Sequence, residues 1–466
     1  MKNNMKKVMS RYFIVIMLAC LLLVSCTKGP GTKTEGGAGK GPTGAFRSMV
    51  PGSIVISPDS RATIYAVTEG SKQYVVMDGK DGKRYESIGE GGALFSHDGR
   101  HVAYSAKDAG KWLAVVDGRE EKKFDGIGRG SMAFSADGFH HAYSAISGNK
   151  RLIVVDGREE KLYDGIGSVP ALSPDGKRVA YAAEVGTKWM VVADGREGKL
   201  YDGIVCAPVF SPDGKKYVYV ALSGKKQLAV LDGVEQASYD AVVEVPVFSA
   251  DGSRLAYIAL TDKKHAIVLD GRKGKTYDGI GASPVFSPDS GHFAYSAQIG
   301  GKWGLVVDGK EQGWYDAVGS STVYSPDGGR LAYSVKRAGK WSVLVDGRPG
   351  KQYDGILGGS LAFSPDGKRL AYAVKQGGKY VVVVDGTEKK LYDGIGFGPV
   401  FSPDSRRIAY AAEKDGRRFV VVDDMEKTPH DSIVTAGGGI VFDSPDRLHY
   451  LILKRADIVL VEESLK

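Results

Sequence analysis

The sequence predicts an all-β fold, a β-propeller of four-stranded blades with about eleven repeat units. The first observation is a repeat that recurs every 38 or 39 residues. The second is that each repeat is rich in Val, Tyr, Phe and Ile, is interrupted by Asp-Gly pairs, and lacks a sustained helical period. The third is that one repeat is too short to bury a core alone. Motifs such as FSPDGKRLAYAV mark the repeats, with aspartates at positions 59, 98, 137, 175, 213, 251, 289, 327, 366 and 404.

The stretch that begins at Cys206 illustrates one repeat. CAPVFS, KYVYVAL, QLAVLD and ASYDAV are the expected strands, and PDGK, SGKK and DGVE connect them. Consecutive apolar residues such as Pro208, Val209 and Phe210 require cover on both faces of the sheet. Sheets stacked around an axis provide that cover and leave only short edges. A right-handed β-helix also repeats, but its coils are shorter, so it is the weaker alternative.

The repeats also resemble a known family. SPDG followed by LAY is similar to the WD40-like repeats of the TolB type, also called PD40 repeats, and the resemblance covers nearly everything after residue 45. The resemblance implies a β-propeller. Because TolB-type propellers dock to peptidoglycan-associated partners, it also implies a protein ligand, by an analogy at the level of the fold alone.

The two ends of the repeat region predict how the ring closes. The C-terminal segment supplies three strands of an eleventh unit. The N-terminal segment AFRSMV, residues 45–50, places Phe46 and Met49 where other repeats have the Tyr and Ile of the outer strand YDGI. We therefore expect this strand to complete the C-terminal blade of a propeller domain that spans residues 45–466. No linker interrupts the period, which favours a single large ring, whereas typical propellers have about four to eight blades, so two tandem propellers are the alternative.

The N-terminus predicts export. Lys2, Lys6, Lys7 and Arg11 precede an apolar run over residues 12–24 that is too short to span a bilayer, which is typical of a signal peptide over residues 1–25. Leu23-Val24-Ser25-Cys26 resembles the lipobox of bacterial lipoproteins, so the resemblance implies acyl chains on Cys26 and a membrane anchor. A plain signal sequence that happens to end at a cysteine is the alternative. Residues 26–44 are rich in Gly, Lys and Thr and are expected to form a flexible tether.

Charge and cysteine content narrow the class of protein. The chain has 63 Lys and Arg against 55 Asp and Glu, and loss of the four basic residues of the signal peptide leaves 59 against 55. So small an excess does not imply a nucleic-acid partner. Cys206 has no predicted disulfide partner in a mature chain and is expected to be a small buried hydrophobe. Thr27 is not Asp, which by the sorting rule of enteric bacteria favours the outer membrane or the periplasmic side over the inner membrane.

Strand order divides the connections between two faces. The SPDG and VVDG turns share one face and are nearly constant, while the second loops and the links between repeats share the other face and vary. Variable loops on a rigid scaffold are where specificity usually resides. The candidate binding residues are Trp314 in GWYD, a possible exposed anchor, Arg129 in the link GRGS, and Glu244 in the link VEVP.

A catalytic or metal site is expected to be a group of residues that occurs once in the chain. The acids of the repeats recur from blade to blade, so they do not form such a group. The aspartates of the fourth strands, from Asp125 to Asp431, are expected to form turn or inter-blade hydrogen bonds. His101, His140 and His292 occupy a basic slot three residues after the repeat aspartate, where metal binding is the minor alternative. Trp112, Trp189, Trp303 and Trp341 follow Gly-Lys or Thr-Lys at the start of third strands, a packing position with sugar stacking as the minor alternative.

The sequence therefore predicts a lipid-anchored, non-catalytic propeller of the bacterial cell envelope that serves as a binding scaffold for another envelope protein. No cofactor and no metal are predicted, since no nucleophile elbow, HExxH motif or phosphate loop is found. The first alternative is an enzyme or a binder of small molecules or carbohydrates that uses the central channel or the variable loops. The second is a passive spacer.

Overall fold

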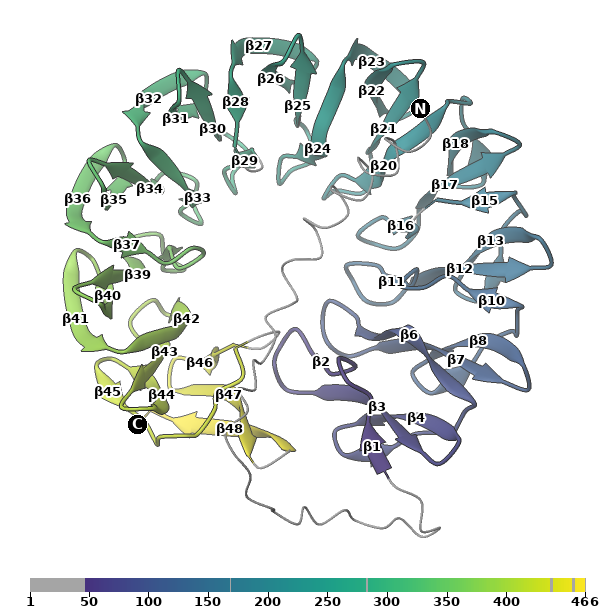
Figure 1. Ribbon diagram of the computed structural model, residues 1–466, viewed down its shortest axis with the longest axis horizontal. Helices are drawn as coiled ribbons and strands as arrows, with labels where there is room; N and C mark the ends of the chain where they lie inside the picture. The colour runs from purple at the N-terminus through teal and green to yellow at the C-terminus, as the bar shows by residue number, and fades with distance from the viewer. Residues whose placement is uncertain (1–46, 168, 282–283, 436–438, 455–456, 466) are drawn as a thin grey trace, which may run out of the picture. The chain divides into compact units, whose positions relative to one another are not determined.

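The computed structural model describes residues 47–167, 169–281, 284–435, 439–454 and 457–465. The compact unit Ser48–Lys466 contains eleven antiparallel sheets that follow one another along the chain and form one ring (Figure 1). The predicted β-propeller and its single large ring are confirmed, and the alternative of two tandem propellers is wrong. The described ranges contain no helix, and hence none long and apolar enough to cross a membrane.

The strands are numbered along the chain, and each sheet is one blade. Blades 1 to 4 contain β1 (Arg47–Met49), β2 (Val55–Ile56), β3 (Thr63–Glu69), β4 (Lys72–Met77) and β5 (Lys80–Asp81); β6 (Ser87–Phe95), β7 (Val102–Asp108), β8 (Lys111–Val116) and β9 (Arg119–Glu120); β10 (Gly126–Ile127), β11 (Ala133–Phe134), β12 (His141–Ser147), β13 (Lys150–Val155) and β14 (Arg158–Glu159); and β15 (Gly165–Ile166), β16 (Ala171–Leu172), β17 (Val179–Val185), β18 (Lys188–Ala193) and β19 (Arg196–Glu197).

Blades 5 to 8 contain β20 (Gly203–Phe210), β21 (Tyr217–Ser223), β22 (Lys226–Leu231) and β23 (Val234–Tyr239); β24 (Ala241–Phe248), β25 (Leu255–Thr261), β26 (Lys264–Leu269) and β27 (Arg272–Tyr277); β28 (Gly279–Ile280), β29 (Val285–Phe286), β30 (Phe293–Ile299), β31 (Lys302–Val307) and β32 (Lys310–Tyr315); and β33 (Ala317–Tyr324), β34 (Leu331–Arg337), β35 (Lys340–Val345) and β36 (Arg348–Tyr353). Blades 9 to 11 contain β37 (Gly355–Ile356), β38 (Ala362–Phe363), β39 (Leu370–Gln376), β40 (Lys379–Val384) and β41 (Thr387–Tyr392); β42 (Gly394–Phe401), β43 (Ile408–Lys414), β44 (Arg417–Val422) and β45 (Met425–Glu426); and β46 (Val441–Ser444), β47 (Arg447–Lys454) and β48 (Asp457–Ser464).

The expected outer strand YDGI is divided between two blades. In the fifth repeat Tyr239 pairs with Gln227 and ends the fourth strand of blade 5. The N–H of the next residue, Asp240, donates to the carbonyl of Leu260 in blade 6 at 2.9 Å, and β24 starts there. The tyrosine therefore closes one blade, and the three residues after it open the next.

This division corrects the expectation for the N-terminal strand. β1 lies beside β3 in blade 1 (Figure 1), where the Gly-Ile segments of other repeats pair, and not in the C-terminal sheet. Met49 is 46% exposed, whereas the residue at the Ile position of the other blades is buried or half-buried. Phe46 lies outside the described residues. In the described part of the chain the C-terminal sheet has three strands, in the order β46, β47, β48.

The core lies between the blades. One apolar cluster combines Ala180 and Val191 of blade 4 with Tyr219 and Val230 of blade 5, and the other neighbouring pairs form similar clusters. The tyrosine six residues after each repeat aspartate is buried in every blade that has one except blade 1, where Tyr65 is half-buried. Tyr201 meets Tyr219 edge to face with ring centroids 6.2 Å apart, a geometry that adds about 0.5–1.5 kcal/mol beyond burial.

The recurring acids fasten neighbouring blades together, as predicted. Asp202 accepts a hydrogen bond from Nζ of Lys188 in blade 4 at 2.5 Å and from the N–H of Gly224 in blade 5 at 2.6 Å. These two bonds, the lysine bond first, hold the pKa of Asp202 below its ordinary value. The same bridge of lysine, carboxylate and backbone N–H is formed by Asp125, Asp164, Asp240, Asp278, Asp316, Asp354 and Asp393.

Blades 11 and 1 meet through side chains that other repeats lack. His449 stands where most other repeats have a buried alanine, and Asp443 stands where they have the turn serine. Nδ1 of the fully buried His449 lies 2.9 Å from the Asp443 carboxylate, and Nε2 lies 2.7 Å from the carbonyl oxygen of Asp59 in blade 1. Arg61 of blade 1 pairs with Asp443 at 2.6 Å. Burial opposes the ionisation of Asp443, but His449 and Arg61 hold its pKa below its ordinary value.

We predict that His449→Leu destabilises the ring by on the order of 1–3 kcal/mol, because the Asp59 carbonyl and Asp443 each lose a buried partner. Denaturant unfolding of the purified protein measures this effect. His101→Leu is the matched control, since His101 pairs with Asp117 within its own blade at the surface and its loss should cost less. Equal destabilisation by the two changes would contradict a special role for His449 in closure.

We further predict that Asp251→Asn lowers the thermal unfolding midpoint at pH 7 and lowers it less at pH 2. The carboxylate of Asp251 accepts bonds from the hydroxyls of Ser249 at 2.6 Å and Ser253 at 2.8 Å, and these bonds lower its pKa. A lowered folded-state pKa gives stability that is present above the unfolded value of about 3.9 and is lost as the pH falls through the folded value. Asp415→Asn is the control, since no described residue donates to the Asp415 carboxylate; a pH-independent effect of Asp251→Asn would refute the explanation.

Candidate binding surfaces

The propeller has two faces, which we name by their connections. The turn face carries the SPDG turns and the VVDG turns, and the loop face carries the second loops together with the links between blades. On the turn face Asp194 accepts the N–H of Val179 at 3.0 Å and Nε of Arg178 at 2.9 Å. Arg178 also donates to the carbonyls of Gly214 and Lys215 in the next blade. The repeated charges of this face therefore hold the blades together, and a binding site has to be sought where the repeat is broken.

The three histidines of the basic slot each contact an aspartate of the same blade. Nδ1 of His101, His140 and His292 lies 2.7 Å from Asp117, Asp156 and Asp308, the acids that pair with arginine in other blades. Among the described residues no three His, Cys, Asp or Glu side chains are arranged to hold a metal ion. These histidines replace arginine in a structural role.

A departure from the repeat exposes an aromatic side chain on the turn face. Two residues after the repeat aspartate, the neighbouring turns carry Arg100, Lys177 and Lys215, whereas blade 3 carries Phe139. Phe139 is 71% exposed, and the side chains of Arg100 and Lys177 are 81% and 78% exposed. Phe139 therefore protrudes from the turn face with an exposed cation on the turn of each neighbouring blade. The sequence analysis missed Phe139, although the break in a basic position was a visible signal.

Aromatic rings connect Phe139 to a buried acid. The His101 ring lies 6.0 Å from Phe139 and 6.4 Å from Phe134, which in turn lies 6.2 Å from His141. Nε2 of His141 lies 2.8 Å from Glu121, which also accepts the hydroxyl of Tyr143 at 2.7 Å. Burial opposes ionisation of Glu121, but these two bonds hold its pKa below its ordinary value. We call Arg100, His101, Phe139, His140 and Lys177 the surface around Phe139. The hydrogen bonds of Glu121 to His141 and Tyr143 hold in place the side chains on which this surface packs.

The three predicted binding residues are not brought together. Trp314 of β32 is half-buried, packs on the core between blades 6 and 7, and covers Gly304, whose missing Cβ would lie 3.0 Å from the Trp314 ring. It is thus not the exposed anchor that we expected, because a glycine beneath it makes room for the ring. Arg129 of blade 3 pairs with Glu90 of blade 2 at 3.0 Å, and both side chains are exposed. Glu244 is exposed in a bulge of β24, with a φ of 65°.

Of the two cysteines considered from the sequence, Cys206 lies within the residues that the structure describes. Cys206 of β20 is half-buried, and burial raises the pKa of its thiol to about 11, so it lacks the thiolate character of a reactive cysteine. Cys26, the signal peptide and the tether lie outside the described residues.

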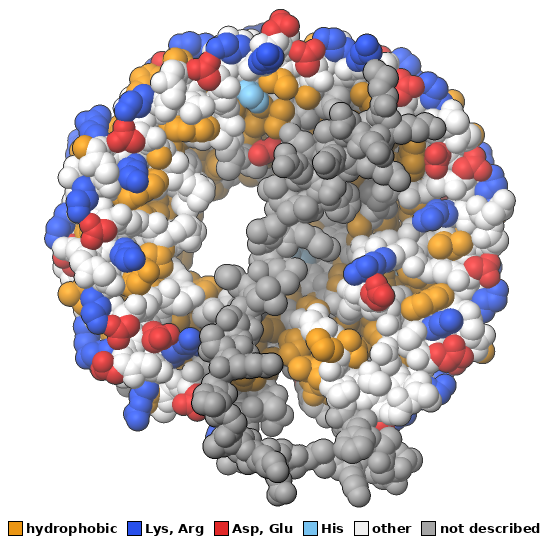
Figure 2. All heavy atoms as spheres, viewed as in Figure 1, with side chains coloured by type: hydrophobic (Ala, Val, Ile, Leu, Met, Phe, Trp, Pro, Cys, Tyr) orange, Lys and Arg blue, Asp and Glu red, His pale blue; other side chains and the backbone are white. Residues whose placement is uncertain are grey.

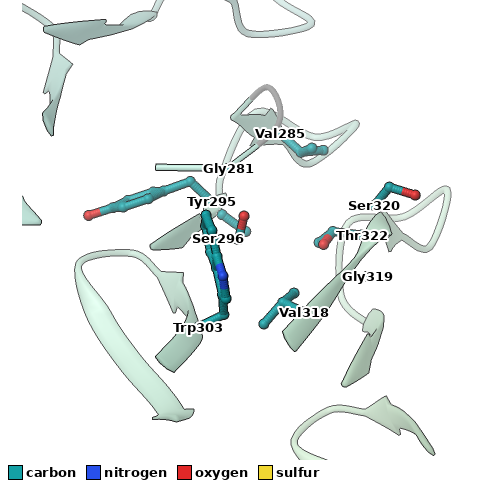
Figure 3. A pocket seen from close by; sticks show the side chains of 10 residues that line it. Gly281, Val285, Tyr295, Ser296, Trp303, Val318, Gly319, Ser320 and Thr322 are labelled. Atoms are coloured by element: carbon teal, nitrogen blue, oxygen red, sulfur yellow. The ribbon is translucent and has the colours of Figure 1, made fainter. Parts of the chain in front are cut away.

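The inner part of the loop face contains a pocket of about 220 Å³ between blades 7 and 8. Figure 3 shows the Trp303 ring on one side of it, with the hydroxyls of Ser296 and Thr322 and the side chain of Val318 around it, while the Ser320 hydroxyl points away. None of the described residues that line it is charged. Figure 2 shows the open centre of the ring, with charged side chains toward the outer rim of the face in view.

Comparison with known proteins identifies no family for this chain. No family model and no curated protein matches the chain. Similar solved structures include the crystal structure of the eukaryotic initiation factor, with 13% identity over 72% of this chain and 94% of that chain and a TM-score of 0.41. TolB from Acinetobacter baumannii has 17% identity over 57% and 76% and a TM-score of 0.26. The β-propeller domain of the Trilobed protease from Pyrococcus furiosus has 15% identity over 56% and 94% and a TM-score of 0.28. At such identities the likeness concerns the β-propeller fold alone.

Proposed function

We propose that the protein is a non-catalytic binding scaffold of the bacterial cell envelope, held at the membrane by acyl chains on Cys26, which docks another envelope protein through the surface around Phe139. The observation that carries the docking proposal is the exposure of Phe139 at a turn position that neighbouring blades give to Arg or Lys. Export and acylation rest on the N-terminal sequence alone, and an outer-membrane or periplasmic location rests on Thr27.

A partner protein gains binding energy from an exposed aromatic side chain that it can bury. Aromatic side chains near the centre of a contact supply much of the energy of protein interfaces. Phe139 offers such an anchor, and Arg100 and Lys177 at its sides offer cations to an acidic rim on the partner. The VVDG acids beneath are already paired, as Asp156 is with His140, so they compete little for that rim.

Binding of a small molecule is the second candidate, and the pocket between blades 7 and 8 favours it. Its ligand is considered in the next section. Arg129 and Glu244 remain proposed contacts of the loop face, at the links where the repeats differ most.

We predict that a photo-cross-linking phenylalanine at position 139 forms one discrete adduct with an envelope protein in living cells. The same residue at Lys368, the equivalent turn position of blade 9, is the control and should give little adduct. With the partner purified, Phe139→Ala should weaken binding by about tenfold or more, equivalent to ~1.4 kcal/mol. Equal adducts at the two positions, or none at position 139, would reject this surface.

We also predict that Cys26→Ser prevents acylation and, if the chain is still exported, releases it from the membrane. The thiol of Cys26 is the attachment point in the lipobox interpretation, and serine offers no thiol. Metabolic labelling with a palmitate analogue measures acylation, and fractionation measures release. Cys206→Ser is the matched control and should keep its label; undiminished label on Cys26→Ser would refute the anchor.

A further inference from the structure

One wall of the pocket between blades 7 and 8 carries a residue that departs from the repeat. Three residues before the turn serine, or before Asp443 in the last unit, the other units carry an apolar residue: Ile54, Ala93, Met132, Pro170, Pro208, Pro246, Pro284, Leu361, Pro399 and Ile440. Blade 8 carries Thr322. In blade 9 the equivalent Leu361 is 6% exposed and packs in the core against blade 8. A threonine at this position fills less space than the leucine of blade 9, and it differs from all the other units by bringing a hydroxyl to the wall of the cavity.

Trp303 supplies a flat apolar wall. It is the first apolar residue of β31, where it pairs with Tyr315, and it is half-buried. Gly281 lies against its ring, at a distance of 3.2 Å from Cζ3 to a Cβ added at the glycine, so a larger residue would crowd the indole. Gly319 of blade 8 lines the opposite side. Small residues on both sides therefore leave part of the indole face open to the pocket (Figure 3).

Two hydroxyls border the same space. Ser296 of β30 and Thr322 of β33 line the pocket, and neither hydroxyl makes a hydrogen bond to a described residue. Ser320 also lines it, but its Oγ points away from the pocket (Figure 3), toward Gly358 of blade 9. Hydroxyl groups in a partly enclosed site need a partner, either water or a ligand. The volume of about 220 Å³ is several times the roughly 30 Å³ that one water occupies in the liquid, so the pocket admits one substituted six-membered ring.

We propose that this pocket binds a single pyranose ring of a neutral sugar. The C–H face of the ring packs on Trp303, and its hydroxyls exchange hydrogen bonds with Ser296 and Thr322. Among the described residues no charged side chain lines the pocket, which disfavours phosphates and other anions, since these need cations or several N–H donors. The two hydroxyls disfavour a plain hydrocarbon, whose entry would leave them without partners. This inference goes beyond the proposed docking function and uses a different face of the propeller.

The test measures binding of methyl α-D-glucopyranoside, methyl α-D-mannopyranoside and methyl α-D-galactopyranoside to the full-length protein by saturation-transfer NMR and calorimetry. Cyclohexanol and inorganic phosphate are the comparison probes. We expect at least one pyranoside to bind in the millimolar range and the comparison probes to bind at least about tenfold more weakly. Binding of none of the three pyranosides, or equal binding of cyclohexanol or phosphate, would overturn the proposal.

Two variants locate the site. Thr322→Leu introduces the residue of blade 9 at this position and should abolish binding while leaving the unfolding midpoint equal or higher, because it fills the pocket. Ser296→Ala should weaken binding several-fold, whereas Ser334→Ala, the equivalent change in blade 8, should leave it unchanged. Unchanged binding by Thr322→Leu and Ser296→Ala would overturn the assignment. Phe139→Ala should bind the sugar as the parent does, so failure of either proposal is distinguishable from failure of the other.

Discussion

The whole structure depends on burial of each sheet between its two neighbours. Central strands such as β25 carry Ala256, Tyr257, Ile258 and Ala259 in succession, and all four are buried. A sheet that is apolar on both faces cannot fold alone, since exposure of both faces forfeits the hydrophobic term that offsets chain entropy. Alanines at the crossing points let adjacent sheets approach closely, while tyrosines fill the wider space nearer the rim. The ring is thus one cooperative object, although it is assembled from local units.

Such a ring needs its blades held at a fixed rotation, and the repeated charges do this. The bridge of Lys188, Asp202 and the Gly224 N–H on the loop face, and the bonds of Arg178 on the turn face, cross the same boundaries near opposite ends of the strands. Each bond is exposed and contributes little alone. Together they restrict how far one blade can rotate against the next. The angle between neighbouring blades has to match the number of blades for the ring to close.

Residues that depart from the repeat therefore carry the special tasks. Asp443 and His449 replace a serine and an alanine and fasten the last blade to the first. Phe139 replaces a cation and creates an aromatic surface. Thr322 replaces an apolar residue and places a hydroxyl in the wall of a pocket. Because the repeat supplies ten or so copies as an internal reference, a single deviant position stands out against a constant structural background.

The sequence by itself determined the fold class, the strand content of each blade and the structural role of the recurring acids, because these follow from a local pattern repeated many times. It also favoured the single ring, since no linker breaks the period. Only the tertiary structure decided that Arg47–Met49 pairs in blade 1, that Trp314 packs over Gly304, and that His449 bridges to Asp59. These features depend on which side chains meet across a blade boundary, hence on contacts between residues tens to hundreds of positions apart. Periodicity gives the side of the sheet on which a residue lies, but the space available there is set by its neighbour in the adjoining blade.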